Sequence, residues 1–103
     1  MSDYTADIKR FAPTVNDAAV AAIVKYCGIA LRGADSSLVS CSDVAEIERV
    51  RDGYAAKKLG LSAAAAEASI ARVCQQMKGE RNKSRVTFYY LLAQDTNTMA
   101  KLA

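Results

Sequence analysis

The residues of this 103-residue chain best suited to covalent chemistry are its three cysteines, Cys27, Cys41 and Cys74. Cys41 lies in the run Ser40–Asp43, and a helix capped by Ser40 would place the thiol in its first turn. Free backbone N–H groups and the helix dipole lower the pKa of a thiol there, so Cys41 is a candidate reactive thiol. We favour the alternative, a small residue packed under the loop, because the sequence offers Cys41 no neighbouring base and no resolving cysteine. Cys27 and Cys74 fall on apolar helical stripes and are expected in the core.

A second candidate site is the basic run 78–85, Lys-Gly-Glu-Arg-Asn-Lys-Ser-Arg, which holds four cations and one acid. It leads into a predicted helix N-terminus, where unpaired backbone N–H groups favour a phosphate or a carboxylate. Lys83, Ser84 and Arg85, together with Arg81, are the expected contacts of such an anion or of nucleic acid. A solvated charged turn is the alternative, and we favour it because the aromatic residues that could stack on bases lie inside the next helix.

Other catalytic and metal-binding patterns are missing from the sequence. The chain has no histidine, which excludes Ser-His-Asp and Cys-His pairs, imidazole metal ligands and imidazole acid–base catalysis. The serines between 36 and 42 have no residue to activate them, and Glu46 and Glu48 point to different faces of a helix. Three dispersed cysteines do not supply four zinc ligands, and five scattered glycines form no phosphate-binding loop. We therefore predict no catalytic residue, no metal and no cofactor.

Composition indicates one globular domain. Hydrophobic residues make up 51% of the chain and charged residues 24%, which excludes disorder of the whole chain. A chain of this size buries roughly two thirds of its unfolded surface, so it can fold without metals or disulfides. The net charge of +3 supports only weak affinity for anions.

The N-terminal residues and the cysteine count bear on localisation. Residues 1–7 are polar and acidic, unlike a signal peptide, and no stretch approaches the roughly 20 apolar residues that span a bilayer. An odd number of dispersed cysteines is also unlike a secreted disulfide framework. We therefore expect a soluble protein in the reducing cytoplasm, with no membrane partner.

Hydrophobic periodicity and capping residues predict a chain built from helices. The expected helices are 5–11, a second from the capping box 14–17 to Arg32, a third from the Ser40–Asp43 caps to Leu59, a fourth from Ser62 to Gly79, and 85–93. The second is apolar on most sides and is expected at the centre of the fold. The fold class is thus all-α, a compact bundle of four to five helices forming a single domain over 1–95, with a frayed tail over 96–103.

Residues 85–93, Arg-Val-Thr-Phe-Tyr-Tyr-Leu-Leu-Ala, are rich in residues that favour strands. No other segment reads as a strand that could pair with them, and an unpaired strand leaves its backbone groups unsatisfied. Ser84 is a good N-cap, so we predict a helix here.

This helix would be apolar on two sides. Phe88 and Leu92 lie on one side and Tyr89 and Tyr90 on the other, which is more apolar surface than a domain near 100 residues can enclose along with the second helix. We therefore expect Phe88, Tyr89, Tyr90 and Leu92 at the interface of a homodimer, with the tyrosines at its rim. The alternative is that the tyrosines lie at the surface of a monomer.

Several runs of the sequence resemble a known family. They include residues 28–32 (Gly-Ile-Ala-Leu-Arg), 37–43 (Ser-Leu-Val-Ser-Cys-Ser-Asp) and 84–93 (Ser-Arg-Val-Thr-Phe-Tyr-Tyr-Leu-Leu-Ala). From near Tyr4 to Ala93 the chain is similar to small bacterial proteins catalogued as domain of unknown function 2853. The resemblance implies a bacterial cytoplasmic protein with no assigned activity, and it supplies no catalytic residues.

The function we expect is that of a small cytoplasmic interaction module without catalytic machinery. Its expected partner is a second copy of itself, with an unidentified protein as a further possibility. The first alternative is a phosphate- or nucleic-acid-binding protein that uses the segment Lys78–Arg85. The second is a thiol-based redox sensor or enzyme centred on Cys41.

Overall fold

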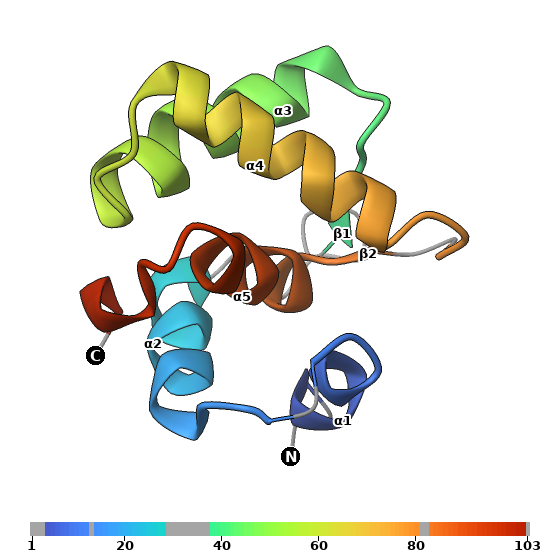
Figure 1. The fold of residues 1–103 in the computed structure, drawn as a ribbon, viewed down its shortest axis with the longest axis vertical. Helices are drawn as coiled ribbons and strands as arrows, with labels where there is room; N and C mark the ends of the chain where they lie inside the picture. Colours follow the sequence, from blue (N-terminus) through green and yellow to red (C-terminus); the bar gives the residue numbers. More distant parts are fainter. Residues whose placement is uncertain (1–3, 13, 29–37, 81–82, 103) are drawn as a thin grey trace.

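The computed structural model describes residues 4–12, 14–28, 38–80 and 83–102 (Figure 1). Within these residues the chain is all-α, as the periodicity predicted. The α-helices are α1 (Tyr4–Lys9), α2 (Asp17–Cys27), α3 (Val44–Arg49), α4 (Ala63–Gln76) and α5 (Arg85–Asp95). The periodic apolar residues of α2 and α4 explain why these segments coil, and packing into one core stabilises all the helices together.

The structure also contains a short sheet that we did not expect. Strands β1 (Leu38–Val39) and β2 (Lys83–Ser84) pair antiparallel, with Leu38 opposite Ser84 and Val39 opposite Lys83. Neither run alternates long enough to be recognised in the sequence, because two residues per strand carry no periodicity. The sheet holds the chain before α3 against the chain before α5.

Helix α5, and not α2, lies at the centre of the fold. Every residue from Val86 to Ala93 is buried, and α1, α2 and α4 all contact this helix. Figure 1 shows α5 between α4 on one side and α2 and α1 on the other. Helix α2 instead exposes Lys25 and Tyr26 on its outer face. A run of apolar and aromatic residues with no charged position fills a central site better than the alanine-rich α2 does.

Helix α2 begins and ends at other residues than the sequence suggested. Its N-cap is Asn16, whose Oδ1 accepts a hydrogen bond from the Ala19 N–H at 3.1 Å, and not Thr14. The helix ends at Cys27, where Gly28 adopts a positive φ of 50° as the C-cap. The expected end at Arg32 falls within 29–37, outside the described residues.

The predicted third helix is divided into two kinds of helix. The α3 segment is followed by η2 (Val50–Lys58), a π-helix in which hydrogen bonds span five residues. One such bond closes its end, from the Leu59 N–H to the Tyr54 carbonyl at 3.1 Å. Val50 and Tyr54 are buried, whereas Val44 is 71% exposed.

Helix α4 follows its predicted pattern. Ser62 caps it by accepting a hydrogen bond from the Ala65 N–H at 3.2 Å. Its predicted apolar stripe is buried over Ala66, Ile70, Val73 and Met77. Cys74, at the edge of the stripe, is half-buried.

The C-terminal segment that we expected to fray contains η3 (Met99–Lys101), a turn of 3₁₀-helix. Thr98 donates its N–H to the Ala93 carbonyl at 2.9 Å, and Asn97 turns the chain with a φ of 57°. Leu102 follows and is buried in the core. Its apolar side chain packs this segment against the core. The surrounding polar residues gave no sequence pattern that predicted this contact.

Candidate functional site

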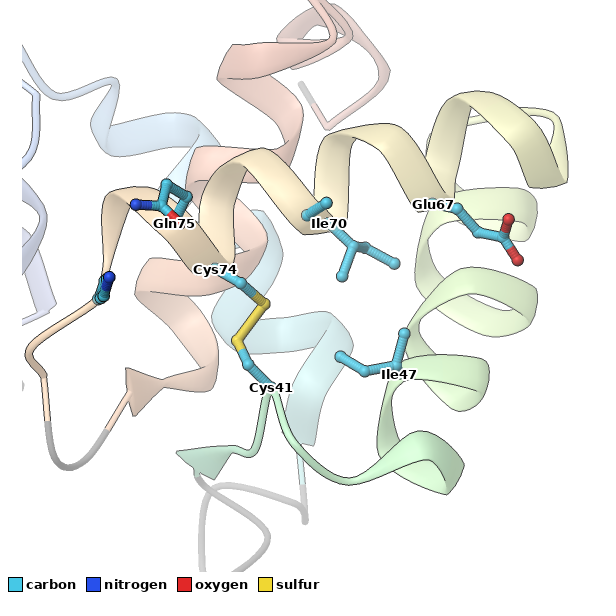
Figure 2. Close-up of a pocket in the computed structure, with 8 residues that line it drawn as sticks. Cys41, Ile47, Glu67, Ile70, Cys74 and Gln75 are labelled. Atoms are coloured by element: carbon cyan, nitrogen blue, oxygen red, sulfur yellow. A yellow bond between two sulfur atoms is a disulfide. The ribbon is translucent and has the colours of Figure 1, made fainter.

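A groove between α3 and α4, which encloses about 480 Å³, could bind a partner. Figure 2 shows Ile47 of α3 and Ile70 of α4 facing each other across it, with Glu67 at one end and Gln75 toward the other. Its floor is therefore apolar and its ends are polar. The lining residues are Cys41, Ile47, Glu67, Ile70, Ala71, Cys74, Gln75 and Lys78. This groove is the candidate functional site.

A disulfide between Cys41 and Cys74 forms one wall of the groove, with the two Cα atoms 6.0 Å apart. Figure 2 shows it joining the turn before α3 to the last turn of α4. We found no resolving cysteine for Cys41 in the sequence, because 33 residues separate it from Cys74. Spacing carries no signal for such a pair, since only the packing of α3 on α4 brings the two thiols together.

The position of Cys41 also differs from our expectation. The N-cap of α3 is Asp43, whose Oδ1 accepts hydrogen bonds from the N–H groups of Ala45 at 3.0 Å and Glu46 at 3.4 Å. Cys41 therefore lies in the turn before the helix and not in its first turn. Asp43 outcompetes Ser40 because its carboxylate is both a cap and a favourable charge at the helix dipole.

The turn that carries Cys41 is held from both sides. Before it, β1 pairs with β2, and Arg85 Nη2 donates a hydrogen bond to the Leu38 carbonyl at 3.1 Å. After it, the Asp43 cap starts α3. These bonds position the turn without the help of the disulfide.

The two ends of the groove carry opposite charge. At one end, Glu67 accepts a hydrogen bond from Arg51 Nη1 at 2.7 Å, and Arg51 also binds Asp52 at 2.8 Å. The hydrogen bonds from Arg51 hold the pKa of Asp52 below its usual range. With one cation and two acids, this end is net negative. The other end carries the ammonium of Lys78.

The residues proposed to bind an anion do not form one surface. Arg85 turns inward and binds Glu46, and Lys83 Nζ donates to the Glu80 carbonyl at 3.0 Å. Ser84 is the last residue of β2 and makes no capping hydrogen bond with its side chain. Arg81 lies outside the described residues. Tertiary contacts thus disperse a cluster that is dense in the sequence.

A buried ion pair that the sequence did not reveal joins Arg85 to Glu46, with Nη2 2.5 Å from Oε1. Arg85 Nη1 also donates to the Tyr89 hydroxyl at 3.0 Å. Glu46 Oε2 accepts from Arg49 Nη2 at 2.7 Å, so the carboxylate lies between two guanidinium groups. This pair is structural: it fixes α3 to α5 and β1, and it faces no described cavity.

The residues expected at a dimer interface are inside the single chain. Phe88, Tyr89, Tyr90 and Leu92 are all buried, because other helices surround α5 on each side. The Tyr90 hydroxyl finds its partner within the fold, accepting from the Asn16 N–H at 2.8 Å. The surplus apolar surface inferred for this helix is therefore wrong, and α5 cannot present these side chains to a second copy.

The third cysteine, Cys27, is free and half-buried beside the aromatic residues of the core. Burial raises the pKa of its thiol from 9.0 to about 11, against an opposing effect of the Arg85 charge. Tyr54 and Tyr89 stack with their ring centroids 3.9 Å apart in the same region. Cys27 thus stays protonated and has little nucleophilic character at neutral pH.

The described part of the chain lacks two features, a metal-binding cluster and a helix that could cross a membrane. Its Cys, Asp and Glu side chains form no cluster of three that could hold a metal ion. None of its helices is both long enough and apolar enough to cross a bilayer.

Comparison with known proteins places the chain in a family. The model of the family described as "Protein of unknown function (DUF2853)" matches residues 3–100, nearly the whole chain. The comparison with curated proteins gives no match. The chain belongs to the DUF2853 family, as the resemblance of its sequence runs indicated.

Proposed function

We propose that this protein is a redox-responsive interaction module, in which reversible formation of the Cys41–Cys74 disulfide controls a binding groove. The observation that carries this proposal is the place of the disulfide, which lines an open groove instead of lying in the core. The module needs no catalytic machinery of its own. It combines the interaction role expected from the sequence with the thiol chemistry considered for Cys41.

The groove position supports exchange with an external thiol. Both cysteines are half-buried and line the same recess, so a thiolate can approach their sulfur atoms from solvent. A disulfide enclosed in the core would be protected from such attack. The fold also has a core that does not depend on this bond, built around α5 and packed against Ile8, Ile23 and Val73.

The exchange uses a dithiol as reductant. Its thiolate attacks Cys41 Sγ, an S–S bond forms between them, the Cys41–Cys74 bond breaks, and Cys74 leaves as a thiolate. The second thiolate of the dithiol then attacks the first dithiol sulfur, which is bonded to Cys41 in the mixed disulfide, and Cys41 leaves as a thiolate. The dithiol loses two electrons and becomes a disulfide, and the chain gains them as two thiolates that take protons from water.

Lys78 supports the direction of this attack. It lies in the turn that follows α4 and lines the same groove as Cys74, so its ammonium stabilises negative charge on the departing Cys74 sulfur. No equivalent cation lines the groove beside Cys41. Cys74 is therefore the better leaving group.

The expected cytoplasmic localisation gives the bond a regulatory meaning. Cytoplasmic thiols are kept reduced, and the disulfides that form there are usually transient and redox-sensing or catalytic. The pair is then open under ordinary conditions and closes by the reverse exchange when a small-molecule disulfide accumulates, which takes up the two electrons and becomes two thiols. Binding of phosphate or nucleic acid finds no comparable support, because the basic segment is dispersed.

A redox titration tests the proposal. The full chain is equilibrated in mixtures of reduced and oxidised dithiothreitol, free thiols are trapped by alkylation, and mass spectrometry counts them while far-UV circular dichroism follows the helices. We expect two thiols to appear and disappear reversibly at constant helicity. The Cys27→Ser variant should titrate like the wild type, whereas Cys41→Ser and Cys74→Ser should show no two-electron transition. A disulfide that opens only when the chain unfolds would refute the proposal.

The role of Lys78 has its own kinetic test. Lys78→Gln should slow reduction by dithiothreitol at pH 7 by roughly two- to fivefold, because the leaving thiolate loses its nearby cation. Lys57→Gln removes a cation from η2, away from the groove, and should leave the rate unchanged. Equal rates for all three proteins would remove Lys78 from the mechanism.

A further inference from the structure

The outer stripe of α4 has a symmetric charge pattern. Glu67, Ala71 and Gln75 are spaced four residues apart along one side of α4, Lys78 lies in the turn that follows the helix, and all four line the groove. An acid stands at one end of the stripe and a cation at the other, with a small residue between them. A second α4 that runs antiparallel to this one presents the opposite charge at each end.

An exposed apolar side chain stands next to the groove. Among the described residues, the large hydrophobic side chains that are exposed are Tyr26, at 44%, and Val44, at 71%. Val44 precedes Ile47 by three residues on α3 and so shares its face, which lines the groove. This face thus combines a recess with an apolar projection, as a self-complementary surface requires.

We propose that a second copy of this chain docks on the α3–α4 face about a two-fold axis that passes near Ala71. The two α4 helices cross antiparallel, so that Glu67 meets the partner subunit's Lys78 and Lys78 meets the partner subunit's Glu67. Val44 of each chain enters the groove of the other. The small side chain of Ala71 lets the two helices approach closely at the axis.

The charges of the groove ends favour this occupant over an unrelated apolar partner. Arg51 holds the Glu67 carboxylate in place but also binds Asp52, so this end keeps one net negative charge for the incoming ammonium. Lys78 forms no ion pair among the described acids. Each copy therefore offers an ammonium to the negative groove end of the other copy, and two-fold symmetry makes this contact twice.

Control by the disulfide follows from the same geometry, and this part rests on the proposed function. The Cys41–Cys74 bond is a wall of the groove and links the turn that precedes Val44 to α4. Oxidation therefore completes the docking face, and reduction loosens it. Docking also covers the sulfur atoms, so the dithiol acts on the monomer and reduction should slow as the protein concentration rises.

Charge reversal tests the docking surface directly. Light scattering after size-exclusion chromatography should give the oxidised chain a mass approaching twice its 11.0 kDa at high concentration. Glu67→Lys and Lys78→Glu should each weaken dimerisation by about tenfold or more, because each creates two like-charge contacts. An equimolar mixture of these two variants should dimerise like the wild type, since each acid then meets a lysine. Lys9→Glu and Lys57→Glu are the matched controls and should change nothing.

The outcomes separate this inference from the function proposed above. An oxidised chain that stays at 11.0 kDa, or a variant mixture that does not recover, overturns the docking surface even if the disulfide titrates reversibly. An irreducible disulfide with dimers that respond to charge reversal overturns the redox control and leaves the docking surface in place. Val44→Glu should also abolish dimerisation, and circular dichroism of this variant should match the wild type because the substituted side chain is exposed.

Discussion

Arg85 Nη2 lies 2.5 Å from Glu46 Oε1, and the two side chains are only 12% and 8% exposed. This pair ties the first turn of α5 to α3, while a hydrogen bond from the same nitrogen reaches the Leu38 carbonyl at 3.1 Å. The Arg85 guanidinium, which the sequence placed in a basic surface patch, thus connects three segments of the chain: α5, α3 and β1.

Removing one member of this pair should be costly. Arg85→Met leaves Glu46 buried beside Arg49 alone, and we expect the free energy of unfolding to fall by about 3–5 kcal/mol. Urea denaturation followed by circular dichroism measures it. Arg49 is 67% exposed, so Arg49→Met should cost under about 1 kcal/mol. Equal losses of unfolding free energy for the two variants would show that burial does not determine how much each arginine contributes to stability.

The Tyr54 hydroxyl donates a hydrogen bond to the Tyr89 carbonyl at 2.9 Å, inside the core. Tyr54→Phe keeps the ring stack but removes this buried hydrogen bond, and should lower the free energy of unfolding by about 1 kcal/mol. Tyr54→Leu should lose roughly 1 kcal/mol more, because the stack disappears as well. Tyr26→Phe, which keeps both ring contacts, is the control in the same urea titrations. If Tyr54→Phe is as stable as the wild type, the hydrogen bond contributes nothing.

The buried thiol of Cys27 should make the stability of the fold depend on pH. Because burial raises the pKa of its thiol from 9.0 to about 11, the folded chain holds this proton more tightly than the unfolded chain. Its contribution to stability is therefore fully present below pH 9 and is lost as the pH rises toward 11. Comparing wild type with Cys27→Ala over this range isolates the effect from the tyrosines. A constant stability difference between the two proteins would contradict the raised pKa.

The same shift predicts slow alkylation of Cys27. Two pKa units correspond to roughly 100-fold less thiolate at pH 8 than an unburied thiol would have. Iodoacetamide labelling of the oxidised chain, followed by mass spectrometry, should be slow in buffer and fast in denaturant. Rapid labelling of the folded chain would show that Cys27 is reactive after all.

Two glycines should respond to alanine in opposite directions. Gly53 lies in η2, and a Cβ added there meets nothing within 4 Å, so Gly53→Ala should stabilise the chain by about 0.5–1 kcal/mol. Gly79 has a φ of 102°, which strains any other residue, so Gly79→Ala should destabilise it by roughly 1 kcal/mol or more. Thermal unfolding of both variants measures the signs, and a gain at Gly79 would contradict the backbone argument.

Local features of the sequence predicted the helices well. The Ser62 cap and the Ala66–Met77 stripe specify α4, and the absence of a long partner strand rightly made 85–93 a helix despite its strand-forming residues. The candidate site was predicted less well, since Cys41 was singled out without Cys74. Periodicity and capping act within a few turns, so they reveal which face of a helix is apolar but not which helix covers it.

The sequence by itself determined that this chain is one helical domain, that it has no histidine chemistry, and that it resembles the DUF2853 family. Only the tertiary structure decided that α5 is the central helix, that Arg85 points inward, and that Cys41 meets Cys74. The physical reason is that these contacts join residues far apart in the chain, and each depends on the relative placement of several packed elements. The sequence around a cysteine or an arginine does not indicate which distant residue its side chain will contact. Only the fold brings that partner close.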